Sequence, residues 1–242
     1  YKKQVAEIIK WQYKFKDIIN LPTKTSVTKI KEMQNIMEIN EQTKKIDIEI
    51  AEKNDVNVLT EAPKFLSNIK NQKVSNTRKG TLMHLCIQKM NEKVQYNEDN
   101  LEVLIDELVR KNIISEEETK AIDKEKILEY TKSNLWLELS NAKEIHKEQP
   151  FYINIKASSI YRTAGEDEEI LVQGVIDLYF INENDELILV DYKTDYVDNE
   201  QKLVEKYKKQ LELYKVALEQ ACSRKVEKIE IYSLYLNKEI FI

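Results

Sequence analysis

The chain has 242 residues, 42% of them hydrophobic, which suits one large domain or two small ones with a sizeable core. Its formal net charge of −5 gives no general attraction for nucleic acid, so any DNA binding must rest on local features. The two cysteines, Cys86 and Cys222, argue against a disulfide framework or a four-cysteine metal cluster and favour a reducing, cytoplasmic setting.

The start of the chain has no secretory signal pattern, and no apolar run is long enough to span a bilayer. Residue 1 is Tyr rather than Met, which indicates a piece cut from a longer protein. Apolar residues at mixed spacing over residues 1–20 predict a short helix with an irregular continuation. A second helix is predicted to follow, with Thr25 or Ser26 as its N-cap.

A polar stretch, residues 40–79, comes next and is expected to hold little regular structure. Gly80 then precedes apolar residues at helical spacing, so a helix is predicted to begin there with Thr81 as its cap. These features divide the chain into an N-terminal helical or linker segment, 1–79, and a main domain, 80–242.

The main domain is predicted to begin with helices and to end in a sheet. Residues 99–138 predict three short helices, and a capping box from Ser115 to Glu118 opens one of them. Apolar patterns then predict four strands, over 148–158, 168–181, 186–193 and 225–236, and a long amphipathic helix over 200–221. Turn residues 182–185 join the second and third strands as a hairpin. The order, helices followed by β-β-β-α-β, indicates an α/β protein in the broad sense, a mixed α+β sheet with helices around it.

A carboxylate and an ammonium end the third predicted strand, where apolar residues 187–190 run directly into Asp191 and Lys193. Alternate residues of a strand share a face, so these two side chains point the same way. The hairpin brings Asp177 close if the register allows. Two close carboxylates favour a divalent cation between them, and Mg²⁺ suits oxygen ligands beside a phosphate. A metal-bound water can attack phosphorus, while Lys193 orients that water or stabilises charge.

Each of these residues has a plainer explanation when taken alone. An Asp-x-Lys pair at a strand end is usually a surface ion pair, Tyr214 more often packs a core, and a histidine on an apolar helix face is more often a hydrogen-bonded core residue. Their combination favours a site. Its further members are His84, Glu148, Gly174 (where a side chain would crowd Asp177), and Gln210 with Tyr214 one helical turn apart.

Five ordered motifs resemble those of RecB-like nucleases of the PD-(D/E)XK superfamily: GTLMHL, EQPF, LVQGVIDLYF, LVDYKTD and QLELY. The likeness covers residues 22–236 and is greatest to the nuclease domains of AddA-type subunits of AddAB complexes, which the upstream KTSVTKIKE and PKFL also resemble. It implies a restriction-endonuclease-like core. It also implies a Mg²⁺-dependent deoxyribonuclease, with Mn²⁺ as a substitute, that acts as an exonuclease in double-strand-break repair and recombination.

The resemblance also implies a role for each residue of the site. The catalytic residues would be Asp177, Asp191 and Lys193. The metal ligands would be His84, Asp177, Asp191 and the main-chain carbonyl of Tyr192. Residues that support the site or place DNA would be Glu148, Thr194, Gln210 and Tyr214.

The implied partners are DNA ends, helicase domains N-terminal to this module, and an AddB-like subunit, with no membrane. The sequence has no G-x-x-x-x-G-K-[ST] loop, so ATP hydrolysis is not expected of this chain. Two cysteines cannot supply the four-cysteine iron–sulfur cluster of AddB-type and Cas-type relatives, which favours the AddA side of the family.

Two alternatives remain open from the sequence. One is a non-catalytic scaffold that keeps the nuclease fold for DNA or subunit binding, although every polar position of the motifs is present. The other is a stand-alone RecB-like nuclease of a phage or CRISPR-associated pathway, against which the start of the chain and the upstream likeness argue.

Overall fold

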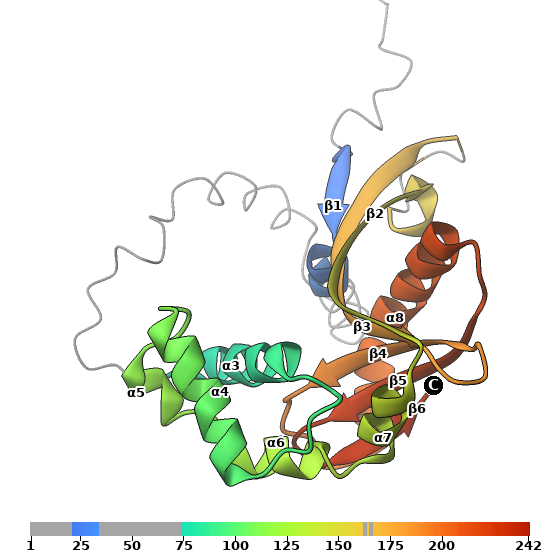
Figure 1. Ribbon diagram of the computed structural model, residues 1–242. Coiled ribbons are helices and arrows are strands. Elements are labelled where there is room, and N and C mark those ends of the chain that lie inside the picture. Colours follow the sequence, from blue (N-terminus) through green and yellow to red (C-terminus); the bar gives the residue numbers. More distant parts are fainter. Residues whose placement is uncertain (1–20, 34–73, 162–163, 165–166) are drawn as a thin grey trace, which may run out of the picture.

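The computed structural model describes residues 21–33, 74–161, 164 and 167–242 (Figure 1). Within them, six strands form one mixed sheet in the order β1-β3-β4-β5-β6, and β2 pairs with the other edge of β3. The strands are β1 (Lys24–Ser26), β2 (Glu144–Lys156), β3 (Glu169–Ile181), β4 (Leu187–Lys193), β5 (Val226–Ser233) and β6 (Lys238–Phe241). The sheet is mixed because β1 joins β3 and β5 joins β4 in parallel, while the other pairs are antiparallel.

Helices cover both faces of this sheet. They are α3 (Asn76–Lys89), α4 (Glu98–Arg110), α5 (Glu116–Thr119), α6 (Lys124–Tyr130), α7 (Asn134–Asn141), the 3₁₀ helix η4 (Ala157–Ser159) and α8 (Glu200–Cys222). Figure 1 shows α3 to α6 gathered away from α8. Along β4, Ile188 and Val190 pack with the first group of helices, and Leu189 packs with α8. Burial on both faces explains why β4 reads as a continuous apolar run.

The β3–β4 hairpin and the long helix α8 confirm the sequence predictions. The hairpin turn is closed by Asn182, whose Oδ1 accepts hydrogen bonds from the backbone N–H groups of Asn184 and Glu186 at 3.0 and 2.9 Å. The capping box from Ser115 to Glu118 is also present, at the start of α5. Apolar periodicity together with local turn and cap chemistry was therefore sufficient to find these elements.

The prediction of a helix start at Gly80 with Thr81 as its cap is wrong. Helix α3 begins at Asn76, and Ser75 is its N-cap, because the Ser75 hydroxyl accepts a hydrogen bond from the Arg78 N–H at 3.1 Å. The first turn of α3 is polar, so the apolar periodicity starts one turn too late to mark it. Helix α3 runs across residue 80. The division of the chain into 1–79 and 80–242 stays a prediction.

Other differences concern short elements. The predicted three helices over 99–138 are four, because the periodic stretch after residue 122 divides into α6 and α7, and Ser133 caps α7. Strands β1 and β6 were not predicted. Of the two predicted caps, Ser26 is the one that caps the helical residues 27–33, and its hydroxyl accepts a hydrogen bond from the Lys29 N–H at 3.2 Å.

The predicted helix within 1–20 lies outside the described residues, as does most of the polar stretch, 40–73. Among the described residues, no helix combines the length and apolar character needed to cross a membrane.

Candidate active site

The candidate site lies where β4 separates from β3. On this edge β3 pairs with β1 as far as Gln173 and with β4 from Leu178 onward, and among the described residues none pairs with it between these two positions. Asp177 stands in this gap. Its Oδ2 accepts a hydrogen bond from the Tyr192 backbone N–H at 3.0 Å. The carboxylate thus satisfies the Tyr192 N–H, which has no partner in the β3–β4 pairing, and this contact fixes Asp177 beside the end of β4.

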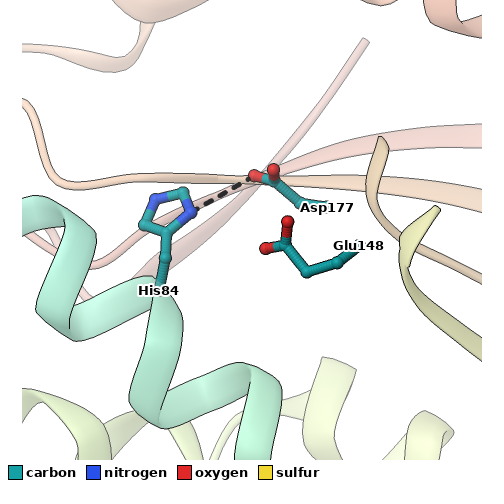
Figure 2. Close-up of side chains that lie close together, drawn as sticks. All are labelled: His84, Glu148 and Asp177. Carbon is teal, nitrogen blue, oxygen red and sulfur yellow. Dashed lines mark ion pairs between the residues drawn. The ribbon is translucent and has the colours of Figure 1, made fainter. Parts of the chain in front are cut away.

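Glu148 and His84 converge on Asp177 from two other elements (Figure 2). The pairs on either side of Glu148 place it opposite Asp177 on β2, with a left-handed φ of 51°, a conformation uncommon for residues other than glycine. His84 projects from α3, and its Nδ1 lies 3.6 Å from Asp177 Oδ2. One ligand atom from each of these three residues lies within 4.8 Å of the others, so the group could hold a metal ion.

Gly80 allows α3 to bring His84 this close. A Cβ atom on Gly80 would lie 2.7 Å from the Thr194 hydroxyl oxygen, on the segment that follows β4. A glycine inside a helix costs roughly 1 kcal/mol relative to alanine, so the close approach explains its presence. Thr194 therefore contributes to the site through the packing of α3 against the end of β4.

Asp191 and Lys193 extend the site along β4. Asp191 is 1% exposed, and its Oδ2 lies 2.5 Å from the Lys193 ammonium nitrogen. From α8, Gln210 Nε2 donates a long hydrogen bond of 3.4 Å to Asp191 Oδ1 and another of 3.0 Å to the Tyr214 hydroxyl. The structure thus brings together all the residues predicted from the motifs. The group that could hold a metal ion contains Glu148 beside His84 and Asp177, and among the described residues it does not include Asp191.

The structure explains the glycine at residue 174 differently from the sequence prediction. A Cβ atom there would lie 2.6 Å from Phe151 Cε1 and 3.1 Å from Val27 Cγ2. The Phe151 ring packs edge-on against Tyr214, with ring centroids 5.5 Å apart. The prediction that a side chain at residue 174 would crowd Asp177 is therefore wrong, because the glycine makes room for a core aromatic ring.

The motifs did not single out Tyr207, whose ring contacts the Lys193 ammonium. Lys193 Nζ lies 4.3 Å from the centroid of the Tyr207 ring, a cation–π contact, and Lys31 Nζ lies 3.6 Å from the same centroid. The Tyr207 hydroxyl donates to Asp195 Oδ2 at 2.7 Å. Tyr207 precedes Gln210 by three residues on α8, and this spacing could have identified it from the sequence.

Burial dominates the electrostatics of the site, and the charge of Lys193 is the next influence on Asp191, Asp177 and His84. Burial raises the pKa of Asp191 to about 6, and Asp177 adds to the rise while Lys193 opposes it. Burial also raises the pKa values of Asp177 and Glu148. Burial and the Lys193 charge lower the pKa of His84 to about 4, so its imidazole is neutral at pH 7 and its nitrogen can act as a ligand. Crowded acids beside a neutral histidine are a donor set that fits a divalent cation.

A cavity of about 960 Å³ opens above these residues. Its lining includes His84, Glu148, Asp177 and Lys193, and also Lys126, Tyr196 and Tyr235. The Tyr192 side chain points away from Asp177 into the core, where its hydroxyl lies 2.7 Å from that of Tyr130. Its ring also lies edge-on to His84, with ring centroids 6.0 Å apart, and its main-chain N–H contacts Asp177.

Comparison with known proteins adds to this geometry. Residues 59–240 match the sequence profile of the PD-(D/E)XK nuclease superfamily. The chain is 31% identical over 248 residues to the A subunit of the ATP-dependent helicase/nuclease of Clostridium novyi (strain NT), with 100% of this chain and 19% of that protein covered. For the protein of the same name from Clostridium botulinum (strain Hall), the values are 32% over 246 residues, 100% and 18%. The chain thus spans less than a fifth of the length of these relatives.

Proposed function

This chain belongs to the PD-(D/E)XK nuclease superfamily, and we propose that it is a metal-dependent deoxyribonuclease module that hydrolyses phosphodiester bonds. The observation that carries the proposal is the convergence of His84, Glu148 and Asp177 beside the Asp191–Lys193 pair at one wall of an open cavity. Isolated ion pairs are common, whereas five such groups from four elements at one point are not.

The proposed metal ligands are His84, Asp177, Asp191 and the Tyr192 carbonyl, and the position of Glu148 makes it a further candidate. When bound, Mg²⁺ or Mn²⁺ would acidify a water molecule and neutralise charge on a phosphate. Gln210 steadies the Asp191 carboxylate from α8. Lys193, held between Asp191 and the Tyr207 ring, offers its ammonium to the attacking water or to the phosphate oxygens.

The proposed setting is a longer protein of the AddA type, in which this module cuts strands delivered by N-terminal helicase domains and works beside an AddB-like subunit in cytoplasmic DNA repair. The likeness to the clostridial helicase–nuclease proteins over the whole of this chain supports it. A partner that holds the DNA would also account for a nuclease module with a net charge of −5.

The test is DNA cutting by the chain and by its Asp191→Ala and Lys193→Ala variants, on linear single- and double-stranded DNA with Mg²⁺, Mn²⁺ or EDTA. We expect cutting that needs metal and disappears in both variants. Glu230→Gln, which changes another buried carboxylate outside the cavity, is the matched control and should cut normally.

Metal binding is measured in the same proteins by calorimetry and by thermal unfolding. The wild type should bind Mn²⁺ or Mg²⁺ and unfold at a higher temperature with it, and Asp191→Ala should not. Cutting that persists in EDTA would overturn the proposed centre. An absence of both cutting and metal binding would favour the non-catalytic scaffold.

A further inference from the structure

The lining of the cavity includes a pair of exposed tyrosines. Tyr196 is 76% exposed and Tyr235 is 37% exposed, and their ring centroids lie 4.6 Å apart at an angle of 56°. Both side chains line the cavity that contains His84 and Lys193. The roles assigned to the site residues leave this pair unused, although it lines the same cavity as Lys193.

The topology of the sheet explains why these two tyrosines meet. Strands β4 and β5 are parallel neighbours, with Lys193 opposite Ser233 at their carboxyl ends. The two chains leave the sheet at the same edge, and the Leu234 N–H donates to the Lys193 carbonyl at 2.8 Å. Tyr196 follows Lys193 by three residues and Tyr235 follows Ser233 by two. The aromatic pair is thus tied to the strand ends that carry the catalytic lysine.

A lysine fixes the hairpin that carries Tyr235. Lys126 of α6 donates from Nζ to the carbonyls of Leu234 and Tyr235, at 3.0 and 2.8 Å. The same ammonium lies 5.0 Å from the centroid of the Tyr235 ring. The rim therefore combines aromatic faces with a cation held in place by main-chain contacts. An unpaired nucleotide offers the matching surface, since it has a flat base and a negative phosphate.

We propose that Tyr196 and Tyr235 form a stacking platform for one unpaired nucleobase of the DNA strand whose backbone reaches Lys193. The inference rests on the proposed nuclease function, to which it adds a base-binding position and a preference. Bases of an intact duplex are already stacked on their neighbours. A platform of this kind therefore selects single strands and frayed ends over intact duplex, and it tolerates any base because each has an aromatic face.

The first test measures binding of a fluorescent single-stranded oligonucleotide in EDTA by anisotropy. Tyr196→Ala and Tyr235→Ala should each weaken affinity by about 5- to 100-fold, the range measured when a stacking aromatic is removed. Tyr196→Phe keeps the ring and should bind normally. The matched control is Tyr152→Ala, because Tyr152 on β2 is 63% exposed beneath Lys24 but does not line the cavity.

The second test uses an abasic oligonucleotide, which keeps the backbone charge and lacks the bases. The wild type should bind abasic DNA as weakly as the double Tyr196→Ala, Tyr235→Ala variant binds normal DNA. The double variant should bind abasic and normal DNA with the same affinity. If the tyrosine substitutions weaken the affinity for abasic and normal strands equally, the platform is overturned. It is also overturned if the wild type binds no single strand, or if the tyrosine substitutions do not alter its affinity.

The two proposals fail in different ways. Binding is measured without metal, so a wild type that binds through its tyrosines but neither cuts DNA nor binds metal overturns the nuclease and supports the base-binding platform. A wild type that cuts with metal, but binds equally well without Tyr196 and Tyr235, overturns the platform and leaves the nuclease intact.

Discussion

Two neighbouring strands of the sheet carry the same chemical pair in opposite order. On β4 the pair is Asp191 and Lys193, and on β5 it is Lys228 and Glu230, in each case two residues apart. Both carboxylates are 1% exposed and both contact their lysine. Spacing and burial therefore do not distinguish a candidate active site from a structural ion pair.

The surroundings of the two pairs make the difference. In the register of β4 and β5, Glu230 lies opposite Val190 and Asp191 lies opposite Ile231, so the two carboxylates point to opposite faces. On its face Asp191 meets Gln210 of α8 and, at the strand end, the Asp177 and His84 group. Lys228 instead meets Glu138 of α7 at 3.3 Å. A site thus requires further donors from other elements at the end of a strand.

The largest expected effect separates the two lysines by activity. Lys193→Met should reduce metal-dependent DNA cutting by about 100- to 1,000-fold, because it removes an ammonium aimed at the reacting groups. Lys228→Met should leave the cutting rate of the folded protein within about threefold of wild type, since Lys228 lies outside the cavity. Single-turnover rates at saturating Mg²⁺ measure both. Equal losses would mean that the β5 pair also takes part in the chemistry.

The next effect concerns stability and is expected at Lys228. Lys228→Met should lower the free energy of unfolding by about 3 kcal/mol at pH 8, because it leaves the buried Glu230 charge without its cation. Burial already raises the pKa of Glu230. A raised pKa favours the folded state when the group is protonated, so the loss should shrink at pH 5. Urea unfolding at the two pH values measures it, and an equal loss at both would contradict this explanation.

A third prediction concerns the pH dependence of the metal-free protein. Asp191 has a folded pKa of about 6, above the ordinary value of 3.8, so the contribution of its proton to stability is present below pH 4 and is lost as pH rises through 6. Between pH 4 and pH 7 in EDTA, the wild type should lose on the order of 2 kcal/mol relative to Asp191→Asn. Added Mn²⁺ at pH 7 should then stabilise the wild type and not the variant.

If the difference in free energy of unfolding between the wild type and Asp191→Asn does not change with pH, the pKa of Asp191 is not raised in the folded protein. Glu230→Gln, compared in the same way, should not change the response to Mn²⁺, because Glu230 points to the opposite face of the sheet. Burial raises the pKa of both carboxylates, so this comparison separates a buried carboxylate that binds the metal from one that does not.

Much of the site was predictable because its residues lie within local patterns. The apolar run of β4 ends in Asp191 and Lys193, and the turn at Asn182 fixes the hairpin that brings Asp177 alongside. The motifs also included His84. Periodicity and turn chemistry detect the strand and the hairpin, whereas the roles of these residues were implied by the resemblance of the motifs to a known family.

The rest depended on contacts between distant segments. Gly80 indicated a helix start, whereas it lies inside α3 to make room for Thr194. Gly174 was assigned to the site, whereas it makes room for Phe151. The left-handed backbone at Glu148, which accompanies its place beside His84, has no sequence signature. A glycine in a sequence therefore indicates a close approach, and the partner in that approach comes from the tertiary structure.

The smallest expected effect is that of Glu230→Gln, in contrast to the isosteric Asp191→Asn. Glu230 contacts Lys228 but its oxygens accept no hydrogen bond among the described residues, and Lys228 retains Glu138 when Glu230 is neutralised. Relief from burying a charge should offset the cost of a buried amide, so unfolding by urea at pH 8 should change by no more than about 1 kcal/mol. Cutting should be unchanged. A loss of cutting without a loss of stability would instead mean that the two pairs are coupled through the backbone of β4 and β5, and that the site extends across the sheet to its opposite face.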